Sequence, residues 1–378
     1  MLVFKRLIED KIRQNLFTGR AILIFGPRQA GKTTLSKKVL TEFGDQGEYF
    51  NCELVTVRKY FELGNPDLLK QMVNNKKIVV FDEAQTIENI GKILKVFIDT
   101  YPEIQVIATG SSSFDLANKI NEPLTGRTFE FILYPLSVSE IKSSIDSLNI
   151  KLGDIYEYMK FGTYPAVVAE SDSLRKERTL KNLSTNYLYK DVYTFAAIKN
   201  PRIFENLIRL LALQIGSLVS INELSNELDI SRATVEKYLR LLEQSYIVRI
   251  VRSFSRNKRK EIKKAFKVYF IDIGVRNAVI DDISLVEKRN DKGYIFENFF
   301  IMERIKESSA EAFPPNFMFW KDRFGAEIDL IEEKNAKINA FECKWNSDNS
   351  TNFKKFLRSY PEAGIQIVSP EYFLENNV

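Results

Sequence analysis

The sequence predicts an α/β fold: a P-loop nucleotide-binding domain with a parallel sheet, a helical segment, a winged helix-turn-helix and a C-terminal α/β domain. A glycine-rich turn joins an apolar strand to a helix near the N-terminus, and a second apolar strand that ends in two acids follows it. Further along, a helix-turn-helix pattern precedes a strongly basic segment. The chain has 378 residues, which is too long for one hydrophobic core and favours two or three domains.

The glycine-rich turn is a complete P-loop. Its residues are Gly26, Pro27, Arg28, Gln29, Ala30, Gly31, Lys32 and Thr33, followed by Thr34. The apolar residues 21–25 before it predict a buried strand, and residues 32–40 after it predict a helix. Backbone N–H groups and a helix N-terminus are therefore expected to point at the phosphates of ATP. We expect Lys32 to neutralise the β- and γ-phosphates, and the Thr33 hydroxyl to join the shell of Mg²⁺.

A second motif indicates that the nucleotide is hydrolysed. The apolar strand 77–81 ends in Asp82 and Glu83, at the edge where parallel strands would meet the phosphates. We expect Asp82 to hold Mg²⁺ through water, and Glu83 to orient or deprotonate the attacking water. Because Glu83 is present, hydrolysis is favoured over binding alone.

A third apolar strand, residues 104–109, ends in a polar segment. If this strand lies beside the other two, Thr109 or Ser111 could sense the γ-phosphate. The alternative is that Ser111 or Ser112 caps the start of a helix. Arg127 is the best candidate for an arginine that acts on the γ-phosphate, in this subunit or a neighbouring one, and an ordinary surface arginine is the alternative.

Composition excludes several chemistries. The chain contains no histidine, which rules out Ser-His-Asp and Cys-His catalysis and histidine-ligated zinc. Any metal must use oxygen ligands, which points to Mg²⁺ or Mn²⁺. The cysteines, Cys52 and Cys343, lie far apart and fit no metal or disulfide framework, so we expect a reducing cytoplasm. No stretch approaches the roughly 18 apolar residues of a membrane span, and the N-terminus carries acids, unlike a signal peptide.

The net charge is only +5, but basic residues crowd one segment, interleaved with Phe254 and Phe266. They are Arg249, Arg252, Arg256, Lys258, Arg259, Lys260, Lys263, Lys264 and Lys267, opposed by Glu261. Upstream, apolar positions predict a helix over 221–228 and, after Ser231 as N-cap, a second helix whose apolar face recurs at helical spacing. Strands over 247–254 and 266–271 would form the wing.

A winged helix usually lays its second helix in a major groove while the wing follows the phosphates. This pattern predicts DNA binding that weakens steeply with salt. A scaffold role, with the charges on a solvated face, is the alternative. The residues expected to contact DNA are Arg232, Lys237, Arg256, Lys258, Arg259 and Lys260.

The C-terminal part holds a second set of chemical groups. Residues 327–331 and 338–345 predict a hairpin whose alternation places Glu342, Lys344 and Asp329 on one face. Such a set can bind Mg²⁺ or Mn²⁺ and activate water for phosphodiester cleavage, with Lys344 positioning water or stabilising charge. Residues 294–305 predict a helix from which Glu297 could reach the same metal. A surface salt bridge would explain the acid-x-lysine pattern as well.

Together these motifs resemble the prokaryotic AAA-type ATPases that carry a winged helix and a C-terminal domain similar to the restriction-endonuclease (PD-(D/E)XK) fold. The resemblance also rests on segments 109–112, 126–127, 134–137, 162–165 and 269–274 and covers nearly the whole chain. It implies that Asp329, Glu342 and Lys344 are the nuclease motif, Glu297 being its helical companion. The proline of that motif is absent before Asp329.

The expected domains are a P-loop AAA-type ATPase domain (1–135), a helical lid or bundle (136–202), a winged helix-turn-helix (203–280) and a nuclease-like domain (281–378). AAA-type ATPases often act as rings completed by a neighbour's arginine, so Arg127 is compatible with a homo-oligomer. Two functions are open: an ATP-driven enzyme that engages and cuts or remodels DNA, and a nucleotide-gated switch whose catalytically silent C-terminal domain binds DNA or a protein.

Overall fold

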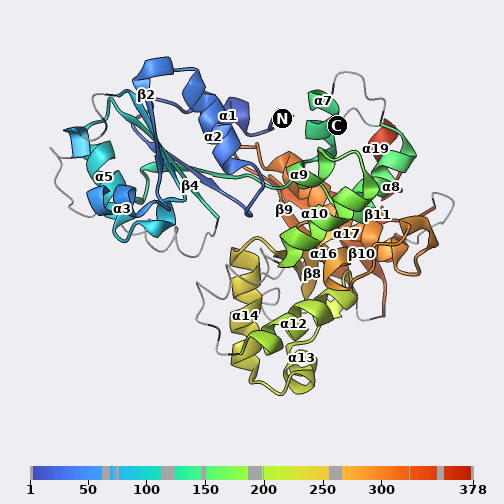
Figure 1. The fold of residues 1–378 in the computed structure, drawn as a ribbon. Coiled ribbons are helices and arrows are strands. Elements are labelled where there is room, and N and C mark those ends of the chain that lie inside the picture. Colours follow the sequence, from blue (N-terminus) through green and yellow to red (C-terminus); the bar gives the residue numbers. More distant parts are fainter. Residues whose placement is uncertain are drawn as a thin grey trace. The chain divides into compact units, whose positions relative to one another are not determined.

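The computed structural model describes residues 3–61, 69–71, 73, 76–111, 124–145, 150–185, 198, 200–254, 266–322, 324–346 and 353–375. The chain divides into two units (Figure 1). Unit 1 comprises Met1–Pro135 with Gln244–Tyr246, and unit 2 comprises Leu136–Glu243 with Ile247–Val378. Among the described residues, no helix is long and apolar enough to cross a membrane.

Unit 1 is a sheet covered by helices. Its elements are α1 (Glu9–Gln14), β1 (Ala21–Phe25), α2 (Lys32–Thr41), η1 (Gly44–Gln46), β2 (Gly47–Asn51), α3 (Val55–Phe61), β3 (Ile78–Asp82), η2 (Ala84–Thr86), α5 (Ile90–Thr100), β4 (Gln105–Gly110) and β5 (Thr128–Ile132). The strand order is β2-β3-β4-β1-β5, and all neighbouring strands are parallel. The prediction of an α/β domain with a parallel sheet is confirmed. Because the strands are parallel, their carboxyl ends share one edge.

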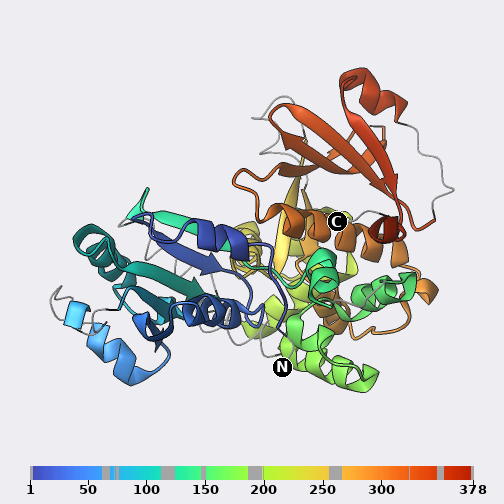
Figure 2. The ribbon, with the colours of Figure 1, turned by 90° about the horizontal axis from the view of Figure 1, so that it is seen from above.

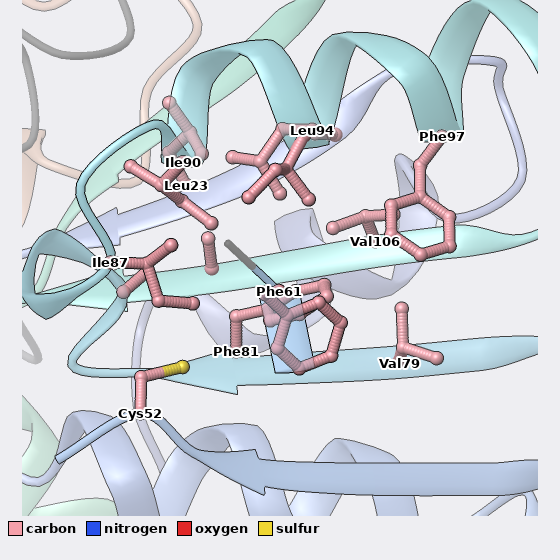
Figure 3. Packing of buried hydrophobic residues seen from close by; sticks show 14 of the residues in the cluster. Leu23, Cys52, Phe61, Val79, Phe81, Ile87, Ile90, Leu94, Phe97 and Val106 are labelled. Carbon is pink, nitrogen blue, oxygen red and sulfur yellow. The ribbon is translucent and has the colours of Figure 1, made fainter. Parts of the chain in front are cut away.

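The three inner strands of the unit 1 sheet are buried on both faces, as in a parallel sheet covered by helices, and the edge strands β2 and β5 are partly exposed. Every residue of β1 and β3 is buried. Side chains alternate along each strand, so Leu23 and Phe81 face α5, where they pack with Leu94 and Phe97 (Figure 3). Each such side chain contributes about 1.5–3 kcal/mol on burial, which holds the carboxyl ends of β1, β3 and β4 in register.

Unit 2 begins with helices and ends in strands. Its elements are α7 (Val138–Ser144), α8 (Leu152–Phe161), α9 (Pro165–Val168), α10 (Ser173–Thr185), α12 (Pro201–Leu213), β6 (Leu218–Val219), α13 (Ile221–Glu227), α14 (Arg232–Gln244), β7 (Val248–Ser253), β8 (Phe266–Phe270), α16 (Ile273–Val279), η4 (Val286–Lys288), α17 (Lys292–Ser308), β9 (Asn316–Lys321), β10 (Glu327–Lys334), β11 (Lys337–Cys343), α18 (Lys354–Ser359), β12 (Gly364–Val368) and α19 (Tyr372–Glu375).

A mixed sheet of order β12-β11-β10-β9-β7-β8-β6 runs through unit 2. Strands β7 and β8 pair antiparallel, and β7 also pairs in parallel with β9. The sheet thus continues across residue 280, where the sequence predicts a domain boundary. Helix α17 packs on β8 and β11 (Figure 2). The domain limits, the winged helix and the nuclease-like fold stay predictions.

A buried aspartate joins two motifs on which the family resemblance rests. Asp272 accepts hydrogen bonds from the backbone N–H groups of Thr163 (2.7 Å) and Val275 (3.1 Å), and the latter bond caps α16. Gly162 has a φ of +76°, and a Cβ at this position would lie 1.9 Å from Asp272 Oδ1. Packing within unit 2 therefore explains why glycine stands at position 162.

We expect Gly162→Ala to lower the free energy of unfolding by about 2–4 kcal/mol, because the methyl group meets Asp272 and the backbone is left-handed. Gly153, in α8, is the matched control, since no atom lies within 4 Å of the Cβ it would gain. Gly153→Ala should be neutral or stabilising by up to about 1 kcal/mol. Urea unfolding of both variants measures the difference, and equal midpoints would contradict this account.

Candidate functional site

The P-loop follows the inner strand β1, between β4 and β5, and leads directly into α2. Gly26 has a φ of +142°, and a Cβ there would lie 2.1 Å from the carbonyl oxygen of Leu133, so only glycine fits. Gly31 also has a positive φ (+102°) and is the N-cap of α2. The loop therefore passes from the strand to the helix N-terminus with its backbone N–H groups near the carboxyl edge of the sheet.

Lys32 is buried and its Nζ donates hydrogen bonds to the carbonyl oxygens of Gly26 (2.8 Å) and Pro27 (2.9 Å). The ammonium group thus lies within the loop itself. Ala30 is buried, Gln29 and Thr34 are exposed, and Arg28 lies 3.6 Å from Glu53 in a partly exposed ion pair.

Asp82, at the end of β3, is buried and accepts three side-chain hydrogen bonds. The donors are the hydroxyls of Thr33 (2.8 Å), Tyr49 (2.5 Å) and Thr109 (2.5 Å). Burial, together with the bond to Asp82, raises the pKa of the Tyr49 phenol, which therefore stays a donor. The predicted magnesium ligands Thr33 and Asp82 are in direct contact.

Glu83 is the next residue and has left-handed backbone dihedrals (φ 51°, ψ 47°). Its backbone N–H donates to Thr109 Oγ1 (3.1 Å), and its carboxylate accepts a bond from Gln85 Nε2 (2.5 Å). The same Gln85 nitrogen lies 3.2 Å from Ser111 Oγ. The third strand therefore lies beside β3, and both Thr109 and Ser111 are linked to the acids. Left-handed backbone at a non-glycine residue is typical of functional sites.

The residues at this edge fit Mg²⁺ and ATP. A loop that only glycine can form, a buried lysine and a hydroxyl in contact with a carboxylate match the donor set for a metal-bound triphosphate. In the part of the chain that is described, no group of three or more acidic or cysteine side chains is arranged to hold a metal on its own. Phosphate oxygens would have to supply further ligands.

Arg127 lies away from this edge. It precedes β5, whose first residue Thr128 is paired with Ala21 at the start of β1, and its Nε donates to Asp99 Oδ1 (2.8 Å) on the surface. A strand of five residues, roughly 15 Å, separates it from the P-loop end of the sheet. The structure does not bring Arg127 to the P-loop of its own chain, and a role in a neighbouring subunit stays a prediction.

A second cluster of charged groups lies in unit 2, around a lysine. Lys267 of β8 is 1% exposed, and its Nζ lies 2.9 Å from Glu297 Oε1, 2.5 Å from Glu327 Oε1 and 3.9 Å from Asp329 Oδ1. Glu297 also accepts a hydrogen bond from the Tyr269 hydroxyl (2.6 Å). The sequence groups Lys267 with the exposed basic segment, and the structure corrects this, because strand β8 is buried along its whole length.

The predicted hairpin is β10 and β11, with Leu330 opposite Phe341. The register of β10 with β9 shifts between Ile328 and Ile331, the stretch that contains Asp329. Asp329 Oδ2 accepts the backbone N–H of Cys343 (2.9 Å).

Glu342 Oε1 accepts from Lys344 Nζ (2.8 Å), and Glu342 Oε2 is buried with no hydrogen-bond partner among the described residues. Lys344 is therefore paired with Glu342, and Asp329 lies close enough to Glu342 to raise its pKa. Glu297 contacts Lys267, whose ammonium lies 3.9 Å from Asp329.

A divalent cation does not fit this cluster as it stands. One predicted ligand, Glu297, and the neighbouring Glu327 contact the Lys267 ammonium at hydrogen-bonding distance. The prediction of a Mg²⁺ or Mn²⁺ site at Glu297, Asp329 and Glu342 did not include this lysine. Among the described residues, no group of three or more acidic or cysteine side chains is arranged to hold a metal.

Burial and neighbouring charges shift the pKa values of the acids in this cluster. Burial, together with the Asp329 carboxylate, raises the pKa of both Glu297 and Glu342 to about 7. Burial raises the pKa of Asp329 as well, whereas the pKa of Glu327 is lowered because Lys267 and Lys321 outweigh its burial.

Comparison with family models gives the class of unit 1. Residues 18–142 match the model of an AAA domain. This part of the chain is an AAA domain of the P-loop ATPase class. Residues 152–285 and 292–373 match two domains of unknown function, DUF8612 and DUF4143.

Similar proteins cover the AAA domain and most of the rest of the chain. An uncharacterized protein of Mycobacterium tuberculosis is 27% identical over 355 residues, which are 93% of this chain and 76% of that protein. One from Methanocaldococcus jannaschii is 26% identical over 381 residues, with 95% and 82% covered. One from Haemophilus influenzae is 26% identical over 279 residues, with 68% of each covered.

Among solved structures, Pif1 helicase from Candida albicans matches 49% of this chain and 48% of the helicase at 14% identity, with a TM-score of 0.27. The chain thus spans about half the length of that structure. The match to the protein VC1899 from Vibrio cholerae covers 93% of this chain and 88% of VC1899 at 11% identity, with a TM-score of 0.16. TM-scores this low do not establish a common fold.

Only some of the residues predicted to contact DNA belong to the described part of the chain. On α14, Arg232, Lys237 and Arg240 are exposed, while Val235 and Leu239 are buried on the opposite face. Arg256, Lys258, Arg259 and Lys260 lie outside the described residues. The helix therefore exposes these three basic residues together with Glu236 and packs an apolar face inward.

Several contacts at the AAA domain were not predicted from sequence. Arg6 is buried, and its guanidinium donates to the carbonyl oxygens of Ala30 (2.6 Å) and Tyr134 (2.6 Å), which ties the P-loop to the segment after β5. Tyr49 donates a hydrogen bond to Asp82, and Gln85 donates one to Glu83. The only sequence signal for them is their place beside strand ends, which many unrelated residues share.

The raised pKa of Glu342 predicts a pH dependence of stability. Between its ordinary value of 4.5 and the folded value of about 7, the folded chain binds the proton more tightly than the unfolded chain does. The free energy of unfolding should therefore fall as pH rises from 5 to 8, by roughly 1–2 kcal/mol from this group. Urea unfolding of Glu342→Gln should show a smaller fall, and an identical pH profile would refute the assignment.

Proposed function

We propose that this chain is a Mg²⁺-dependent ATPase that binds DNA through unit 2. The observation that carries the proposal is the hydrogen-bonded set at the carboxyl edge of the AAA domain. There Thr33 contacts Asp82, and Thr109 contacts both Asp82 and the backbone of Glu83. Hydrolysis needs this combination of a metal-binding carboxylate and a second carboxylate beside a P-loop.

Different residues at this edge would bind the phosphates and the metal. The P-loop N–H groups would bind the phosphates, and Lys32 would exchange its bonds to the loop carbonyls for bonds to phosphate oxygens. Thr33 and Asp82 would hold Mg²⁺, which when bound neutralises charge on the transferred phosphoryl group.

Glu83 would orient the attacking water and accept its proton. Gln85 keeps that carboxylate beside Ser111, so Glu83 and the end of β4 respond together to a ligand at this edge.

The exposed basic face of α14 supports DNA binding. Arg232 and Lys237 have no ion-pair partner among the described residues and are exposed cations of the kind that contact phosphates. Neutralising phosphates releases counterions, so affinity should fall with salt. Base-specific recognition is not part of the proposal.

The geometry around Lys267 favours DNA binding over DNA cleavage. Glu297 and Glu327 are already neutralised by a lysine, which leaves no described set of three acids for a metal. This arrangement supports the function in which ATP controls binding and the C-terminal domain is catalytically silent.

A single reaction tests both parts of the proposal. The full chain is incubated with labelled linear, single-stranded and branched DNA, with ATP and either Mg²⁺ or Mn²⁺, and phosphate release and DNA cleavage are followed together. We expect phosphate release, DNA binding in a gel-shift assay, and equal cleavage backgrounds from wild type and Asp329→Ala. Cleavage that Asp329→Ala abolishes would instead establish an ATPase–nuclease.

A further inference from the structure

The acid cluster of unit 2 contains its own cation. We infer that the Lys267 ammonium occupies the place among these carboxylates where a divalent cation would otherwise bind, and that this lysine keeps a latent metal site closed. The inference concerns unit 2 without nucleotide and does not depend on ATP hydrolysis by the AAA domain.

The contacts of Lys267 are those of a bound cation. It comes from β8, while its carboxylate neighbours come from α17 and β10, so it joins elements far apart in the sequence. Its distances to Glu297 (2.9 Å) and Glu327 (2.5 Å) are those of charge-assisted hydrogen bonds. Mg²⁺ would need about 2.0–2.1 Å to several oxygens, and the ammonium group lies among the same oxygens.

Burial makes this charge essential to the cluster. The side chains of Lys267 and Glu297 are 2% and 8% exposed. Burial alone would lower the pKa of Lys267, but Glu297, Asp329 and Glu327 raise it above its ordinary value, so the lysine is charged. Removing one partner of a buried ion pair leaves uncompensated charge, which the structure must neutralise in another way.

One further carboxylate oxygen of the cluster is available to a metal. Glu342 Oε2 is buried with no hydrogen-bond partner among the described residues, although the Asp329 carboxylate is close enough to raise the pKa of Glu342. If the ammonium were absent, Glu297, Glu327, Asp329 and Glu342 would provide carboxylate oxygens from α17, β10 and β11. Hard divalent cations prefer such a set.

Lys267→Met tests the inference, because methionine keeps the length of the side chain and removes its charge. The probe is Mn²⁺ without nucleotide, in full-length protein that also carries Asp82→Asn, so that the P-loop edge binds no metal. We expect the Lys267→Met protein to bind one Mn²⁺ at least about 100-fold more tightly than the same background with Lys267, by electron paramagnetic resonance. Its thermal midpoint should rise by at least about 3 °C with Mn²⁺.

Lys321→Met is the matched control. Lys321 also contacts Glu327 (2.5 Å) but is 34% exposed and does not lie among the other acids. Its removal should create no Mn²⁺ site. If Lys267→Met does not fold, Lys267→Met/Glu297→Gln removes a cation and an anion together and should still gain Mn²⁺.

Two results would overturn the inference. One is a folded Lys267 variant, single or double, that binds no more Mn²⁺ than its parent. The other is a parent protein that already binds Mn²⁺ and loses it on Glu342→Gln, since the site would then be open with Lys267 in place. Neither result bears on phosphate release by the AAA domain, so the two proposals fail separately.

Discussion

Glu83→Gln should lower ATP turnover by at least about 100-fold and leave ATP binding in place. The amide retains the size of the side chain and its contact with Gln85, but it cannot accept a proton from water. Thr33, Asp82 and the P-loop are untouched, so the affinity for nucleotide should stay within about threefold of wild type. Phosphate release and equilibrium binding of a fluorescent ATP analogue measure the two effects.

Glu88→Gln is the control for this substitution, because Glu88 is an exposed acid five positions further along the same segment. It should retain wild-type turnover. Equal turnover by Glu83→Gln and Glu88→Gln would show that another group activates the water and would remove Glu83 from the site.

Reversing the charges on α14 should have the second-largest effect. We expect Arg232→Glu/Lys237→Glu to weaken DNA binding at least about 30-fold at low salt and to reduce the slope of log affinity against log salt by about 2, because two phosphate contacts are lost. Both side chains are exposed, so the fold should not change. Fluorescence anisotropy with labelled duplex over a range of salt concentrations gives both quantities.

Arg175→Glu/Arg178→Glu changes the net charge by the same amount on exposed positions of α10. If general charge alone governed binding, both double variants would weaken it equally, and the assignment of α14 as the DNA-contacting helix would be wrong. A selective loss with the α14 variant supports it.

The AAA domain could be predicted from sequence because its motifs report backbone geometry directly. Gly26 is required by its φ and by the closeness of Leu133, so its spacing from Lys32 carries structural information. Parallel pairing then places the ends of β1, β3 and β4 at one edge, which brings Thr33, Asp82 and Thr109 together.

The contacts that sequence did not predict depend on which distant elements are neighbours. Tyr49 reaches Asp82 only because β2 lies beside β3, and Arg127 is remote from the P-loop because β5 runs parallel to β1. The sequence alone could not show that Arg127 lies far from the P-loop of the same chain, because this follows from how β5 pairs with β1.

The contacts of Lys267 in unit 2 could not be predicted from sequence for the same reason. Its position among basic residues favours a solvated face, yet Phe266, Val268 and Phe270 alternate with it along a strand that is buried on both sides. A lysine in such a strand requires a partner. That partner, Glu297, is 30 residues away and could not be chosen from the sequence, because other acids were equally available.

The most direct test of the ATPase assignment is phosphate release by the full chain with Mg²⁺ and ATP, compared with Lys32→Ala and with Lys92→Ala, an exposed lysine on α5. We expect turnover by wild type and Lys92→Ala, none above background by Lys32→Ala, and loss of all turnover when EDTA removes the metal. Turnover that persists in Lys32→Ala would contradict the account, because a nucleotide held elsewhere in the chain would then be the one hydrolysed.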